Sequence, residues 1–141
     1  MAVKITVKAV IEILGTPKEH VEETMKKIVE KLKQEYKIKE AKVYEATEVK
    51  AKTTVLWNSF VDLEMIFEDL QKITDFCFDY MPSSIEIVEP LELKIDARNH
   101  TDLINDLLAR LHQYDMVVKN LNAENKLLKQ QIISSNSRHN P

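Results

Sequence analysis

The sequence contains a single glycine, Gly15, among 141 residues. Loops that cradle phosphate groups need several glycines close together, so a nucleotide-binding loop of that kind is excluded. Ligand-sensing regulatory domains also usually bind through glycine-containing turns. The shortage of glycine therefore disfavours a metabolite-binding regulatory domain, although it does not exclude one.

The chain also has one cysteine, Cys77, and no long apolar run. A lone cysteine cannot form an internal disulfide, and we interpret Cys77 as a small buried hydrophobe, not a nucleophile. No apolar stretch approaches the roughly 20 residues needed to cross a bilayer. The first residues, MAVKITVK, alternate between apolar and polar, unlike a signal peptide. We therefore expect a cytoplasmic protein without a membrane segment.

Patterns for catalysis and metal binding are also scarce. The four histidines are scattered, and none pairs with another histidine, a cysteine or a carboxylate at metal-ligand spacing more often than chance would give. Ser83 and Ser84 follow a proline in a turn without a nearby base. Asp62 and Glu64 share one face of a predicted strand and could act as an acid–base pair, but a solvated sheet face is the simpler interpretation. We expect no catalytic residue, no cofactor and no metal, hence no enzyme.

Charge is segregated along the chain although the net charge is only −3. Residues 1–61 hold 12 lysines and 9 acidic residues, 62–106 hold 3 basic and 12 acidic residues, and 107–141 hold 5 basic and 2 acidic residues. A solvated surface is sufficient to explain the acidic middle segment. The alternative, more specific interpretation is that this acidic segment binds a partner with a basic patch.

What the sequence does contain is a clear order of strands and helices. Residues 3–13 and 53–68 alternate with period two and predict two long strands. Residues 37–46 and 83–90 show shorter strand patterns. Residues 47–52, TEVKAK, are interpreted as a polar connection.

Two amphipathic segments of helical period lie between these strands. The first ends near Tyr36, and its start is predicted at Pro17, with Thr16 as the N-cap and Glu19 closing a capping box. The second follows the long strand and is stopped by Pro82.

This order predicts an α+β fold with a ferredoxin-like βαββαβ domain, in which two helices cover one face of a four-stranded antiparallel sheet. We assign residues 1–90 to this domain, 91–100 to a linker, 101–133 to a coiled-coil helix and 134–141 to a flexible tail. The same layout carries RNA-binding, ligand-sensing and assembly domains, so the fold alone does not give the function.

The C-terminal segment contains a heptad repeat over about four heptads. Branched residues at a with leucine at d favour a parallel two-stranded coiled coil, and a single asparagine at an a position fixes its register. We therefore interpret Asn125 as a residue that selects one partner geometry at some cost in stability. The a positions are Ile104, Leu111, Val118, Asn125 and Ile132, and the d positions are Leu107, Tyr114, Leu121 and Leu128.

The charges beside the seam agree with a parallel dimer. Arg110 at g would face Asp115 at e of the partner, and Glu124 would face Lys129. Each pair contributes only ~0.5 kcal/mol, but both are attractive.

The alternative is a helix that lies on its own domain. It gains support from Leu103 and Leu108, which widen the apolar stripe at its start. We expect the first turns to pack on the domain and the rest to project as a coil. The repeat resembles a leucine zipper over about 30 residues. It does not resemble a zipper transcription factor, because the preceding segment is acidic where a DNA-gripping helix is rich in Lys and Arg.

The most distinctive stretch is DFCFDYMPSSIEIVEP. Its Phe76, Phe78, Tyr80 and Met81 cannot all face one sheet, and we interpret them as a possible partner surface. Together with ARLHQYDMVVKNL, this stretch resembles a group of small uncharacterised archaeal proteins with a ferredoxin-like domain and a C-terminal coiled coil. The resemblance covers most of the chain and implies no activity.

The leading hypothesis is a non-enzymatic homodimeric assembly module with an unidentified protein partner. The alternatives are a regulatory domain that binds a small metabolite and a ribosome- or nucleic-acid-associated factor. Phe60 and Val61 lie where an RNA-recognition strand places aromatic residues, but the glycine and the Lys or Arg of that motif are missing and the neighbourhood is acidic. We therefore expect no nucleic-acid binding.

Overall fold

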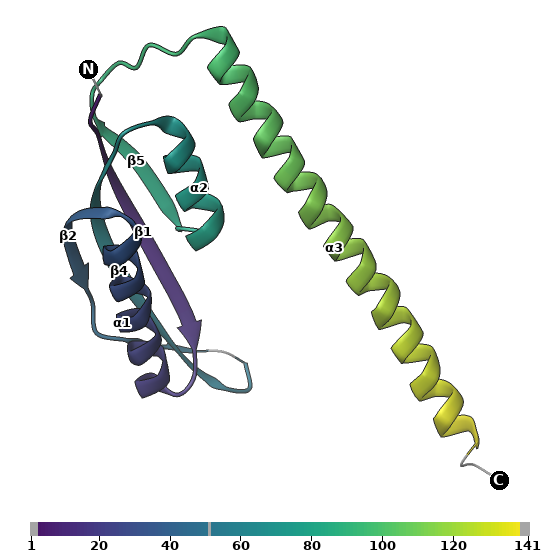
Figure 1. Ribbon diagram of the computed structural model, residues 1–141. Helices are drawn as coiled ribbons and strands as arrows, with labels where there is room; N and C mark the ends of the chain where they lie inside the picture. The colour runs from purple at the N-terminus through teal and green to yellow at the C-terminus, as the bar shows by residue number, and fades with distance from the viewer. Residues whose placement is uncertain (1–2, 51, 139–141) are drawn as a thin grey trace. The chain divides into compact units, whose positions relative to one another are not determined.

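The computed structural model describes residues 3–50 and 52–138. The chain divides into two compact units, Met1–Leu93 and Lys94–Pro141. The first unit combines a sheet with two helices, and the second is one long helix (Figure 1). The predicted α+β class, with an antiparallel sheet and a long C-terminal helix, is confirmed.

The elements of the first unit follow the predicted order with one addition, the short strand β3. They are β1 (Ile5–Gly15), α1 (Lys18–Glu35), β2 (Lys37–Val43), β3 (Thr47–Lys50), β4 (Val55–Phe67), α2 (Leu70–Tyr80) and β5 (Ser84–Glu89).

The sheet is antiparallel with the strand order β2-β4-β1-β5, and β3 also pairs with β4. On one side β4 pairs with β1, from Phe67 opposite Ile5 to Trp57 opposite Gly15. On its other side β2 covers the second half of β4 and β3 covers the first half. The prediction that residues 47–52 form only a connection is therefore wrong. Thr47–Lys50 supplies hydrogen-bonding partners to the start of β4, which is longer than β2.

The core lies on one face of this sheet. Buried side chains alternate along β1 and β4, as period two predicts. Helices α1 and α2 cover the same face, because their buried side chains join one cluster with those of the strands. The cluster comprises Ile5, Val7, Ala9, Ile11, Met25, Val29, Leu32, Val61, Leu63, Met65, Phe67, Ile73 and Phe76. Among the described residues of this unit, both helices lie on the core face, and none packs on the other face of the sheet.

Helix α1 begins one residue later than predicted. Pro17 is the N-cap, with an extended ψ of 175°, and no side chain caps the helix. The predictions that Thr16 is the N-cap and that Glu19 closes a capping box are therefore wrong. The first helical hydrogen bond runs from the Val21 amide to the Pro17 carbonyl, at 3.1 Å.

Helix α2 has a cap at each end. The Asp69 carboxylate accepts a hydrogen bond from the Lys72 amide at 2.8 Å, which satisfies a donor of the first turn. At the other end Met81 adopts the left-handed conformation, with φ 48° and ψ 58°, and its amide bonds the Cys77 carbonyl. Pro82 follows directly, as the sequence predicts.

The second unit is α3 (Ala97–Arg138), a helix of 42 residues. Asp96 caps it, since its carboxylate accepts from the Asn99 amide at 2.7 Å. The helix thus begins four residues before the predicted position 101. It also continues through residues 134–138, where we expected a flexible tail; residues 139–141 lie outside the described part of the chain. No helix among the described residues is long and apolar enough to cross a membrane.

Candidate interaction surfaces

Helix α3 carries an apolar stripe that its own unit does not cover. None of its residues is buried. The eight apolar residues at the predicted a and d positions are 37% to 60% exposed, from Leu107 to Ile132. A helix with an apolar stripe is stable in water when that stripe is packed against another surface. The stripe is therefore the first candidate interaction surface.

Ion pairs within α3 involve two of the predicted interhelical partners. Arg110 Nε lies 3.2 Å from Asp106 Oδ2, and Lys119 Nζ lies 2.8 Å from Asp115 Oδ2. Both pairs connect residues four apart on the helix surface. Because exposed pairs of this kind contribute little, they leave Arg110 and Asp115 able to exchange partners in an assembly. Asn125 is exposed, as are the a and d residues on either side of it.

The aromatic residues of α2 divide between the core and the surface. Phe76 is fully buried, with its ring centroid 5.6 Å from Tyr36 and 5.9 Å from Phe67. It is therefore a core residue and cannot line a partner surface, contrary to our prediction. Tyr80 stacks on Phe76 at 5.7 Å and donates a hydrogen bond from its hydroxyl to Glu35 at 2.8 Å.

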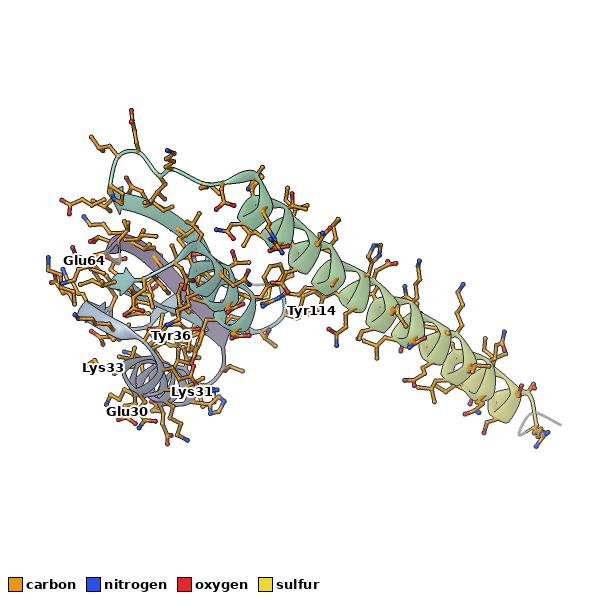
Figure 2. The ribbon with its side chains drawn as sticks, turned by 45° about the horizontal axis from the view of Figure 1, so that its top comes forward. Glu30, Lys31, Lys33, Tyr36, Glu64 and Tyr114 are labelled. Atoms are coloured by element: carbon orange, nitrogen blue, oxygen red, sulfur yellow. The ribbon has the colours of Figure 1, made fainter. Side chains whose placement is uncertain are left out.

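Tyr36 and Tyr80 connect the end of α1 to this aromatic cluster. Tyr36 directly follows the last residue of α1, and Lys31 lies on the last turns of that helix (Figure 2). Lys31 Nζ lies 5.8 Å from the Tyr80 ring centroid. Burial raises the pKa of Tyr36, and burial together with the hydrogen bond to Glu35 raises the pKa of Tyr80. A tyrosine is already protonated near neutral pH, and these upward shifts of the pKa extend that range to more alkaline pH.

Of the four residues of the predicted partner surface, Met81 is the most exposed, at 72%. Phe78 and Tyr80 are half-buried. The sequence could not separate these residues, because a spacing of two between positions 76, 78 and 80 is also the period of a strand. In helix α2, Phe76 and Tyr80 lie four residues apart on one face, and Phe78 projects from a different face. The structure leaves Met81 as the clearest surface residue of this group.

The helix-free face of the sheet is hollowed and charged. The hollow has a volume of about 620 Å³ and is lined by residues of β1, β2, β4 and β5 with Tyr44. Across the strands, Lys8 lies opposite Glu64 on β4 and Glu86 on β5. Figure 2 shows Glu64 on the side of the sheet away from α1. Opposite charges on neighbouring strands stabilise such a face in water.

Asp62 and Glu64, the candidate acid–base pair, each have a partner on this face. The Tyr44 hydroxyl donates to Asp62 at 2.9 Å, and Lys39 Nζ lies 3.7 Å from Glu64. Lys42 Nζ lies 4.9 Å from the centroid of the Tyr44 ring. These contacts suit a solvated polar face better than a proton-transfer site.

The MJ0538 family matches residues 6–133. The chain belongs to the MJ0538 family. The match includes residues of both units, so the sheet domain and α3 belong to one family pattern. No function comes to the chain with the family, in agreement with the resemblance drawn from the sequence. Comparisons with curated proteins and with solved structures gave no match.

A metal site would need three or more His, Cys, Asp or Glu side chains close together. The described residues of this MJ0538-family chain contain no such group. Cys77 is half-buried and packs against the core cluster. Burial raises the pKa of its thiol, so the reactive thiolate is disfavoured. This placement agrees with the interpretation of Cys77 as a small hydrophobe.

Proposed function

We propose that this protein is a non-enzymatic assembly module that forms a parallel homodimer through α3. One observation carries the proposal: the apolar a and d positions of α3 are 37% to 60% exposed over the whole repeat. An isolated helix gains little stability in water from propensity alone, so a second copy of the stripe is the simplest cover. The first partner of the module is therefore a second copy of the same chain.

The residues beside the stripe support the parallel register. In a parallel pair, each g residue faces the e residue five positions later on the other helix. Of the four such pairs within residues 101–133, one joins two apolar residues, two join opposite charges, and one joins an apolar residue to a polar residue. These pairs are Leu103 with Leu108, Arg110 with Asp115, Glu124 with Lys129 and Val117 with Asn122.

The sheet domain would then be the part that the dimer presents in two copies. The strand order β2-β4-β1-β5 supports a ferredoxin-like arrangement, with β3 as an addition beside β4. An unidentified protein partner would bind this domain. An archaeal source and a cytoplasmic location belong to the same proposal; the lone cysteine supports a reducing compartment.

Light scattering tests the assembly directly. We expect the full chain to have the mass of a dimer and a truncation to residues 1–100 to be a monomer. The truncation retains the whole core cluster, so its circular dichroism provides the folding control. A monomeric full chain at micromolar concentration would contradict the coiled-coil proposal.

A regulatory domain that binds a small metabolite is the second candidate. The hollow of about 620 Å³ on the helix-free face favours it, because its volume falls in the range of ligand sites. Thermal shift assays with amino acids, nucleotides and organic acids test it. A compound that stabilises the wild-type protein, but not a Lys8→Ala variant, would support this candidate.

A further inference from the structure

Strand β5 carries two isoleucines on the face of the sheet that the helices cover. Ile85 lies opposite Ala9 and Ile87 lies opposite Val7 on β1. Paired residues of antiparallel strands project to the same face. Val7 and Ala9 are 0% and 2% exposed, whereas Ile85 and Ile87 are each 41% exposed. The helix layer of the first unit therefore leaves β5 only partly covered.

The positions of the two helices explain this gap. Helix α1 packs on β1, β2 and β4, while α2 packs mainly on β4. At the two ends of β5, Met81 is 72% exposed and Leu91 is 96% exposed. Single exposed apolar residues are normal, but four of them within residues 81–91, around one partly covered strand, indicate a place of contact.

The same segment has charge of one sign. Residues 73–93 contain five carboxylates and no lysine, arginine or histidine. Four of the carboxylates are exposed, and the part of the chain that the structure describes offers none of these four an ion pair: Asp79, Glu86, Glu89 and Glu92. Glu86 and Glu89 lie opposite Lys8 and Thr6 of β1 and so project to the other face of the sheet, whereas Asp79 lies on α2 in the helix layer. A partner with cationic side chains would be attracted to Asp79 and to Glu92, which follows β5.

The geometry favours a helix over a strand as the partner element. A strand added to the edge of β5 would lie beside the sheet and would leave the outer surfaces of Ile85 and Ile87 uncovered. The edge is also short, carries Glu86, ends at Pro90 and has an irregular register with β1, all of which oppose strand pairing. A helix in the layer of α1 and α2 would cover both isoleucines.

We propose that β5 and its flanks are the docking surface for an amphipathic α-helix of a partner protein. The apolar stripe of that helix packs on Ile85 and Ile87, and Lys or Arg residues beside the stripe face Asp79 on α2 and Glu92 after β5. The proposal rests on the assembly function above, since it gives the kind of partner that the module receives.

Fluorescence anisotropy of the full-length protein with two labelled helical peptides tests this. Both peptides have about five helical turns and the same leucine stripe, flanked by lysines in one and by glutamates in the other. We expect the lysine peptide to bind at least about tenfold more tightly. The pair Ile85→Ser and Ile87→Ser should weaken its binding by about tenfold or more. Equal binding of the two peptides, no binding, or binding unaffected by the isoleucine changes overturns the proposal.

Matched variants distinguish binding at this surface from a general electrostatic attraction between the lysine peptide and the acidic protein. Leu14→Ser removes an apolar side chain that is 57% exposed on the other face of β1, and should leave binding unchanged. Asp79→Lys, on α2 in the helix layer, should weaken binding, whereas Glu30→Lys, on α1, should do so less than twofold. If the two charge reversals have equal effects, the attraction is not localised and the proposal fails.

A third peptide with the sequence of residues 101–133 distinguishes an external partner from a second copy. Displacement of the lysine peptide by this α3 peptide would assign the surface to another copy of the chain and overturn the external partner. Light scattering of the Ile85→Ser, Ile87→Ser protein should still give a dimer. A monomeric wild-type protein that nevertheless binds the lysine peptide would remove the assembly function and keep this surface.

Discussion

At the scale of single residues, the shortage of glycine has a cost at the end of α2. The left-handed conformation that closes this helix is most easily adopted by glycine, because a Cβ atom approaches the following carbonyl there. Met81 occupies this conformation, with φ 48°. Its side chain is 72% exposed, so packing in the first unit does little to offset the strain.

Replacing Met81 with glycine should therefore stabilise the sheet domain. We expect Met81→Gly to raise the free energy of unfolding by up to about 1 kcal/mol, since relief of strain exceeds the entropy cost of glycine. Urea denaturation followed by Trp57 fluorescence measures this. Met81→Ala keeps the strain and is the control; equal stability of the two variants would count against the argument.

The effect of Asn125 on stability depends on a second chain, whereas the effect of Met81 lies within one chain. If it faces its counterpart in a parallel dimer, Asn125→Leu should raise the melting temperature, since apolar packing replaces a buried polar pair. Mixed dimers and higher oligomers should appear in analytical ultracentrifugation. Unchanged stability and unchanged oligomeric state would mean that Asn125 is ordinary surface and that the seam ends near Leu121.

At the scale of elements, segments with a strong apolar periodicity could be predicted from the sequence. A strand that exists only because it pairs with a neighbouring strand could not. The alternation along β1 and β4 is long enough to identify both strands and their buried faces. Strand β3 has four residues and becomes a strand only because β4 extends past β2. Asp96 starts α3 through a single side-chain cap, a signal that we did not use when placing the helix at 101.

The candidate surfaces show the same division. The heptad stripe of α3 is readable from the sequence because it depends only on spacing along one helix. The buried position of Phe76 depends on Tyr36 and Phe67, which belong to other elements of the fold, and Tyr36 also lies far from it in the sequence. The exposure of Ile85 and Ile87 depends on where α1 and α2 pack. Neither of these could be predicted from local pattern alone.

The charge pairs beside the seam give a prediction for α3 as an element. Lys129→Glu should weaken the dimer slightly, because Glu124 of the partner would then face a like charge. Adding Glu124→Lys should restore it. Each step should change the free energy of dimerisation by ~0.5 kcal/mol, read from melting curves at low salt. Additive losses in the double variant would contradict the pairing.

At the scale of the whole molecule, the distribution of charge opposes binding to nucleic acid. Residues 62–106 hold 12 acidic and 3 basic residues. We expect no measurable binding to RNA or duplex DNA at physiological salt, tested by anisotropy with labelled oligonucleotides. Binding that weakens steeply with added salt would show phosphate contacts and favour the ribosome- or nucleic-acid-associated alternative.

The location of the core also determines how the two units respond to protein concentration. Every residue of the core cluster belongs to the first unit, and α3 buries none of its own. The sheet domain should therefore unfold in a unimolecular reaction, while the helical pair dissociates and unfolds by mass action.

Two probes can follow these reactions separately. The single tryptophan, Trp57, lies on β4 and reports the sheet domain, whereas circular dichroism in the helical region is dominated by α3. We expect the dichroism midpoint to rise with protein concentration and the fluorescence midpoint to stay constant. Midpoints that rise together would mean that the sheet domains also join the dimer. With separate midpoints, the amount of protein in the cell would set how much of α3 is paired, while the sheet domain stays folded at any expression level.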